Sequence, residues 1–151
     1  MTVEITRLSN GLTIATETMP ALDSAALGVW VKSGARDETS DEHGLAHFLE
    51  HMAFKGTEKR DASAIAREIE AVGGHLNAYT ARENTAYYAK VLKEDMPLAA
   101  DILGDILTHS TFTPEEMERE RGVILQEIGQ ANDTPDDIVF DHFQASAFAD
   151  Q

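Results

Sequence analysis

The sequence predicts an α+β domain whose mainly antiparallel sheet carries helices packed on one face. Three observations indicate this class: an alternating N-terminal segment interrupted by Asn-Gly, a pair of strand-like runs in the middle of the chain, and helical spacing on both sides of that pair. Strands and helices come in groups rather than in strict alternation, which favours antiparallel pairing. The 151 residues suffice for one domain, which we expect to extend over residues 1–151.

The N-terminal segment has the pattern of a β-hairpin. Residues 3–7 and 12–16 alternate on either side of Asn10-Gly11, and Asn-Gly between alternating runs is the strongest short-range hairpin signal. The apolar run 26–31 then predicts a buried strand. We therefore expect Trp30 of this strand to pack in the core rather than to contact a ligand at the surface.

Two further strands are expected in the middle of the chain. Residues 75–80 and 85–92 are rich in β-branched and aromatic side chains and flank a polar turn at residues 82–84. Tyr87 and Tyr88 are expected in the core for the same reason as Trp30.

A first helix is predicted from about Asp41 to Phe54, because its apolar residues recur at intervals of three and four, which indicates a packed face. These residues are Leu45, Phe48, Leu49 and Met52. Lys55-Gly56 ends this helix, since glycine accepts the left-handed conformation at a helix terminus. A second helix follows over residues 61–72, with Asp61 as its N-cap.

Three more helices complete the chain, beginning near Asp95, at Thr113 and at Thr134. In the second of these, Thr113 is the expected cap, the following proline occupies the first helical position and Glu116 closes a capping box. Thr134 begins the last helix by the same logic. These helices have few strands after them to pack against, so we expect the domain to be incomplete at its C-terminal end.

Composition excludes several classes of protein. The net charge of −15 disfavours binding to phosphate backbones, so we expect no nucleic-acid partner, and a basic peptide is a more natural one. The chain has no cysteine, hence no disulfides or thiolate ligands. No apolar stretch approaches the roughly 20 residues of a membrane span. The N-terminus resembles neither a signal peptide nor a presequence, which favours a bacterial cytoplasm over a mitochondrial matrix.

The sequence His47-Phe48-Leu49-Glu50-His51 has the spacing of a metal site. On a helix, the two histidines lie one turn apart on one face, and Glu50 projects toward the same face. This order inverts the H-E-x-x-H motif but supplies the same parts, two nitrogen ligands and a carboxylate. The alternative is a surface helix with two solvated histidines.

A catalytic zinc ion needs a third protein ligand and a water molecule. Glu120 and Glu127 are seven residues apart on one predicted helix, hence on one face, and by spacing alone either could be that ligand.

Three blocks of the sequence resemble the pitrilysin-type zinc peptidases, over nearly the whole chain and in the right order. They are His43–Thr57, Gly74–Glu83 and Glu118–Glu127. The resemblance is strongest to the branch that contains the mitochondrial processing peptidase beta subunit and its bacterial relatives. It implies that this chain is the N-terminal, truncated first half of a two-domain metallopeptidase subunit. The missing second half or a homologous subunit would then be its partner.

The resemblance also implies roles for the motif residues. His47, His51 and Glu127 would bind one zinc ion per chain, whose water is the nucleophile. Glu50 would be the general base, and Glu120 would be an acidic residue that supports the metal site. His43 lies close by in sequence, but a solvated or hydrogen-bonded histidine is the simpler interpretation.

Substrate contacts are implied at two further places. A peptide would lie as an added strand along Asn77, Ala78 and Tyr79, a mode of recognition led by the backbone. Asp137 and Asp141, one turn apart on the last helix, match positions that bind an arginine upstream of the cut in processing peptidases, and carboxylates suit a guanidinium. Without the resemblance, both would be interpreted as solvated helix charges.

The function so predicted is a zinc endopeptidase that hydrolyses short, basic or presequence-like peptides, including arginine-containing ones. The sequence is also compatible with two alternatives. The chain could be a non-catalytic structural or partner subunit, or it could be a fragment of such a peptidase that is inactive alone.

Overall fold

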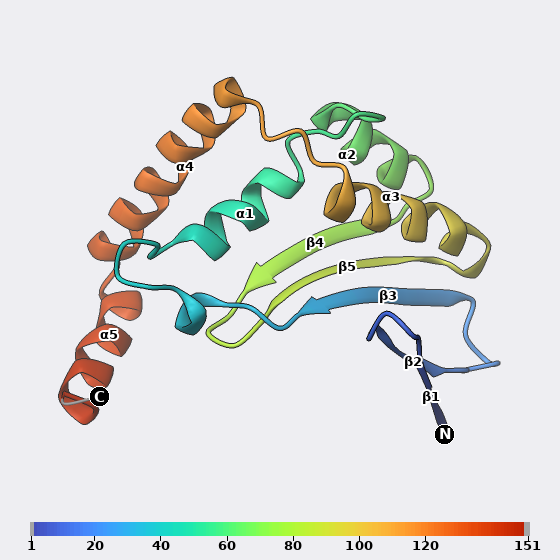
Figure 1. Ribbon diagram of the computed structural model, residues 1–151, viewed down its shortest axis with the longest axis horizontal. Coiled ribbons are helices and arrows are strands. Elements are labelled where there is room, and N and C mark those ends of the chain that lie inside the picture. Colours follow the sequence, from blue (N-terminus) through green and yellow to red (C-terminus); the bar gives the residue numbers. More distant parts are fainter. Residues whose placement is uncertain (1, 150–151) are drawn as a thin grey trace.

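A three-stranded antiparallel sheet forms the centre of the molecule, with helices on one of its faces (Figure 1). The computed structural model describes residues 2–149. The strands are β3 (Ser24–Val31), β4 (His75–Thr80) and β5 (Thr85–Leu92), in the order β3-β5-β4. Both pairings are antiparallel, so the predicted fold class is confirmed.

The main core lies between the central strand β5 and the helices α2 (Ala62–Ala71) and α3 (Met96–Thr108). From β5, alternate residues face these helices, whereas the residues between them face away. Ile102, Leu103 and Ile106 of α3 are at most 1% exposed and fill the space above the sheet. The helical members of the core are Ala53, Ile65, Ile69, Ala99, Ile102, Leu103 and Ile106, and the members from β5 are Tyr87, Ala89 and Val91.

The opposite face of the sheet is open within the described part of the chain, and here one expectation was wrong. Trp30 is 61% exposed, and β3 is a partly exposed edge strand rather than a buried one. The indole covers Gly28, where a Cβ atom would come within 2.6 Å of the ring, and its Nε1 donates to the Tyr79 hydroxyl at 3.3 Å. An apolar run does not reveal which face of its sheet will be covered.

The N-terminal hairpin is confirmed but stands apart from the main sheet. Strands β1 (Val3–Arg7) and β2 (Thr13–Glu17) pair antiparallel with each other in a separate two-stranded sheet. Gly11 adopts a φ of 91° in the turn, a conformation that glycine accepts without strain. All residues of both strands are exposed.

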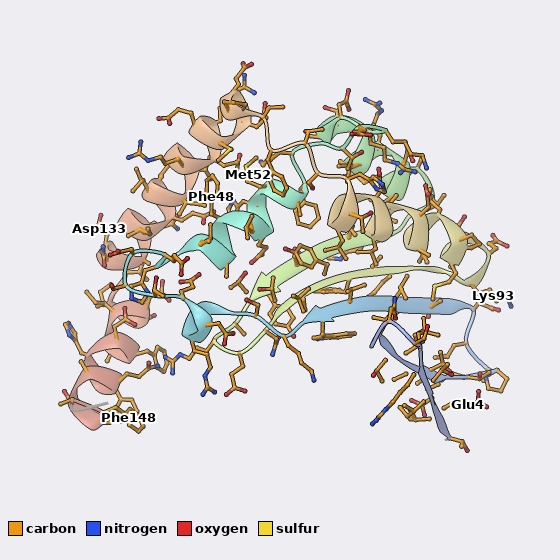
Figure 2. The ribbon with its side chains drawn as sticks, in the orientation of Figure 1. Glu4, Phe48, Met52, Lys93, Asp133 and Phe148 are labelled. Carbon is orange, nitrogen blue, oxygen red and sulfur yellow. The ribbon has the colours of Figure 1, made fainter. Side chains whose placement is uncertain are left out.

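Helix α1 (Leu45–Ala53) begins four residues later than predicted, because Gly44 has a left-handed conformation. Its packing also differs from the expectation: Leu45 and Leu49 are 45% and 43% exposed. Met52 is 1% exposed, and Figure 2 shows it with Phe48 in the space between α1 and α4. The buried face of α1 is therefore divided between the sheet and α4.

The chain ends with α4 (Pro114–Asp133) and α5 (Pro135–Ala147). Thr113 caps α4 by accepting from the Glu116 N–H at 3.4 Å, but the Glu116 carboxylate pairs with Arg119, so the predicted capping box is half formed. Helix α5 begins at Pro135 with Thr134 in the N-cap position, as predicted. The Thr134 hydroxyl donates to the Gln130 carbonyl at 2.8 Å, however, so the predicted side-chain cap is not formed. None of the described helices is both long and apolar enough to cross a membrane.

A buried arginine fixes the loop that follows α1. Arg60 is 5% exposed, and its guanidinium donates to Glu68 at 2.8 Å on α2 and to Asp105 at 3.0 Å on α3. It also donates to Asp101 at 2.5 Å, which Lys59 contacts at 2.6 Å. A buried charge is tolerated only when it is paired and hydrogen-bonded, so this cluster holds the end of α1 against two helices.

Asp101 makes the stability of this cluster dependent on pH. Hydrogen bonds from Lys59 and Arg60 lower its pKa from 3.8 to about 2. Because the folded state favours the ionised form, the contribution is present above pH 4 and is lost as the pH falls toward 2. We expect Asp101→Asn to be less stable than wild type at pH 7 and to lose less of its stability between pH 4 and 2. Chemical denaturation across this pH range is the measurement.

The matched control is Asp133→Asn, at an exposed position at the end of α4. It should follow the wild-type curve. Parallel curves for wild type and Asp101→Asn would contradict the assignment of acid sensitivity to this cluster.

Candidate metal centre

Helix α1 brings two imidazoles together by its own geometry. His47 and His51 are one turn apart, their ring centroids are separated by 4.6 Å, and the rings are nearly perpendicular. The two Nε2 atoms are 3.1 Å apart. The side chains of His47 and His51 are 40% and 19% exposed, so neither is a fully solvated surface group.

Helix α4 adds a carboxylate to this pair. The Glu127 Oε2 atom lies 3.7 Å from Nε2 of His47 and 3.6 Å from Nε2 of His51. One ligand atom from each of the three residues lies within 4.8 Å of the others. The structure thus separates the two glutamates that spacing alone left equivalent, because Glu120 faces a different nitrogen.

Glu120 contacts His51 on the side away from this group. Its Oε2 lies 3.0 Å from Nδ1 of His51, and its Oε1 accepts from the Lys55 ammonium at 2.6 Å. Burial opposes ionisation of Glu120, which is 5% exposed, but the hydrogen bonds from Lys55 and His51 outweigh burial and lower the pKa. The contact of Lys55 with Glu120 was not predicted from the sequence, in which Lys55 was expected only at the end of the helix.

This contact determines which nitrogen of His51 is available. An ionised carboxylate can only accept a hydrogen bond, so Glu120 favours the neutral tautomer of His51 that has its proton on Nδ1 and its lone pair on Nε2. The Nε2 atoms of His47 and His51 and a carboxylate oxygen of Glu127 therefore lie close together, and a cation could bind all three. Two histidines and a carboxylate, with no sulfur, are a ligand set that zinc accepts.

Glu50 is on the same helix and faces the sheet. Its Oε2 accepts a hydrogen bond from the Thr80 hydroxyl of β4 at 2.5 Å. Burial raises the pKa of Tyr87, and the negative charge of Glu50 raises it further, which indicates that this carboxylate lies near the phenol. Thr80 is not among the site residues predicted from the sequence, although alternation along β4 puts it on the same face as Leu76 and Ala78.

Glu38 holds the beginning of α1 and was also missed. Its side chain is 8% exposed and accepts from the backbone N–H groups of Ala46 at 2.7 Å and Gly44 at 2.8 Å. These hydrogen bonds lower its pKa. The separations of eight and six residues fall outside local capping patterns, so no capping rule could have found it.

The expected substrate residues lie on an edge of the sheet. β4 pairs with β5 on one side only among the described strands. Asn77 and Tyr79 are exposed on the open face, whereas Ala78 packs toward the core. Their side chains therefore diverge, and what they present together along this edge is backbone.

The expected arginine pocket lies on a different helix. Asp137 and Asp141 are exposed and one turn apart on α5, and they are not members of the metal-ligand group. α5 is held beside the turn between β4 and β5 by a hydrogen bond from Arg82 to Gln144. His43 is 70% exposed and 3.9 Å from Glu38, which agrees with a solvated histidine.

Comparison with known families identifies the group to which this chain is related. The sequence profile described as insulinase (peptidase family M16) matches residues 13–151. The chain belongs to this family. The predicted resemblance to inverted-motif zinc peptidases is thereby confirmed.

Individual relatives agree with the family. The chain is 53% identical to the mitochondrial-processing peptidase subunit beta of Blastocladiella emersonii, over 96% of this chain and 31% of the relative. It is 50% identical to a zinc protease of Rickettsia felis, over 97% of this chain and 36% of the relative. The chain thus spans about a third of the length of these relatives.

A solved structure shares the fold. A protease from Helicobacter pylori superposes with a TM-score of 0.88 over 92% of this chain and 34% of that protein, at 24% sequence identity. The arrangement of strands and helices in Figure 1 is therefore one that an experimentally determined protease also has.

Metal binding should stabilise the fold, because the candidate ligands come from two helices. With free zinc at about 100 times its Kd, the stabilisation is about 2.7 kcal/mol, which corresponds to a rise in Tm of roughly 5–10 °C for a chain of this size. We expect this rise for wild type and its loss in Glu127→Ala. Differential scanning fluorimetry with and without zinc measures it.

His43→Ala is the matched control, since it removes an exposed histidine near the same helix. It should keep the full rise. A rise retained in Glu127→Ala, or lost in His43→Ala, would contradict the ligand set.

Proposed function

We propose that this chain contributes the catalytic zinc site of an endopeptidase. The observation that carries the proposal is the convergence of His47, His51 and Glu127, with Glu50 on the same helix as the two histidines. Membership of the M16 family and relatives named as processing peptidase and zinc protease support a peptidase function.

In this proposal, His47, His51 and Glu127 hold one zinc ion. When bound, zinc supplies Lewis acidity that activates a water molecule and polarises the scissile carbonyl. Glu50 accepts the proton of that water and delivers it to the leaving amine. Glu120 keeps the proton of His51 on Nδ1 and thereby leaves Nε2 as the ligand atom.

The peptide substrate would add as a strand along Asn77, Ala78 and Tyr79. The unpaired edge of β4 offers backbone groups for this mode of binding, and backbone pairing is tolerant of sequence. Asp137 and Asp141 would select arginine, and the net charge of −15 would attract basic peptides in general.

Two other proposals are weaker. A non-catalytic partner subunit would not need the four residues of the site, yet this chain has both histidines, Glu50 and Glu127. A site that binds zinc without turnover in the isolated chain is the second, since the relatives are about three times as long. We propose that a further segment or a homologous subunit completes the substrate-binding site. A bacterial cytoplasm stays our prediction for its location.

Glu50→Gln tests the role of the base. The amide cannot accept the water proton, so we expect cleavage to fall about 10²–10⁴-fold while zinc binding stays at the wild-type level. The assay is mass spectrometry of an arginine-containing presequence peptide incubated with the chain and zinc. Metal content is measured on the same samples.

Glu118→Gln, on the exposed surface of α4, is the control and should cleave like wild type. Loss of zinc in Glu50→Gln would show that Glu50 has a different role. Equal cleavage by Glu50→Gln and wild type would refute the proposed mechanism.

The double variant Asp137→Asn and Asp141→Asn tests the arginine pocket. We expect it to raise KM for a peptide with arginine upstream of the cut and to leave an alanine-substituted peptide unaffected, because only the guanidinium pairs with these carboxylates. Steady-state kinetics on the two peptides measure this difference. An equal change for both peptides would remove the two residues from the specificity site.

A further inference from the structure

Thr80, the last residue of β4, faces the helix that carries the candidate site. Along β4, Leu76 and Ala78 pack against the core, and alternation puts Thr80 on their side. Its hydroxyl donates to Glu50 Oε2 at 2.5 Å and lies 3.4 Å from the Ala46 carbonyl. Both of these acceptors belong to α1, so the side chain joins the edge strand to the metal helix.

The donor in this contact is held more firmly than the acceptor. Thr80 is paired with Thr85 of β5, and a β-branched side chain has few rotamers. Glu50 has three rotatable side-chain bonds and is only half-buried, so without a partner its carboxylate would sample several orientations. A hydrogen bond to an ionised carboxylate is strong enough to select one of them.

We propose that Thr80 is a positioning residue that holds the Glu50 carboxylate in the orientation needed for proton transfer. The Thr80 hydroxyl donates to Oε2 of Glu50, which leaves Oε1 of the same carboxylate to accept the proton of the water molecule. Since Thr80 directly follows the edge residues Asn77, Ala78 and Tyr79, it also couples the strand on which a peptide would lie to the base. This proposal rests on the proposed function for the role of Glu50, but the contact itself can be tested without cleavage.

A double-mutant cycle in thermal unfolding tests the contact without metal or substrate. Thr80→Val keeps the shape and removes the hydroxyl, and Glu50→Ala removes the acceptor. We expect Thr80→Val to lower Tm by roughly 3–6 °C in the wild-type background and by much less in the Glu50→Ala background. The difference between the two backgrounds reports the interaction.

Thr85→Val is the matched control for this cycle. It removes a hydroxyl from the neighbouring position on β5 that donates to the Ser33 carbonyl at 3.0 Å and does not contact Glu50. Its effect on Tm should be the same in both backgrounds. Equal effects of Thr80→Val in both backgrounds would overturn the proposal.

Peptide cleavage tests the positioning role. A base displaced by about 1 Å can cost on the order of 100-fold in rate, so we expect Thr80→Val to lower kcat about 10- to 100-fold with KM and zinc content unchanged. Thr80→Ser restores the hydroxyl and should recover most of kcat. If Thr80 acted only through packing, Thr80→Val, which keeps the shape of the side chain, would have a higher kcat than Thr80→Ser.

The two hypotheses fail in different ways. If wild type does not cleave while the cycle shows coupling, the proposed function fails for this chain and Thr80 still positions Glu50. If wild type cleaves and Thr80→Val cleaves equally well, the positioning role is overturned and the proposed function stands.

Discussion

The pairing of a buried carboxylate with His51 determines where α4 lies, and the candidate site depends on that placement. Glu120 is the residue of α4 that is buried among the described residues. Removing a carboxylate from water costs several kcal/mol unless it is paired, and Lys55 and His51 of the α1 segment supply the partners. Moving α4 by one turn would leave this charge buried and unpaired. Glu127, two turns further along, therefore arrives at the Nε2 atoms of the histidines.

Helix α1, which carries the rest of the site, is held by residues that have no proposed catalytic role. Glu38 holds the first turn of α1, and the Arg60 cluster holds the loop after its last turn. The helix with the two histidines is thus fixed at both ends, and β4 contacts it in the middle through Thr80. When the supporting side chains are fixed by packing and hydrogen bonds, the site keeps its geometry without a bound ligand. Catalytic residues require such a fixed geometry.

The local part of this arrangement could be predicted from the sequence, and the long-range part could not. The turn of a helix sets the approach of His47 to His51, and strand alternation sets the helix-facing residues of β5. Spacing could not distinguish Glu120 from Glu127, since seven residues put both on one face. It also could not reveal that Trp30, Leu45 and Leu49 are exposed, because exposure depends on which elements cover a face. Glu38 and Thr80 act across separations that no local pattern encodes.

Helices α1 and α4 meet so that Glu127 completes the proposed metal site while Glu120 orients His51 through its Nδ1 atom. X-ray diffraction from crystals of the chain grown with zinc, recorded on both sides of the zinc absorption edge, tests it most directly. We expect one anomalous peak between the Nε2 atoms of His47 and His51 and the carboxylate of Glu127, with Glu120 still at Nδ1 of His51. A peak bound by Glu120 in place of Glu127, or one located at the aspartates of α5, would contradict it.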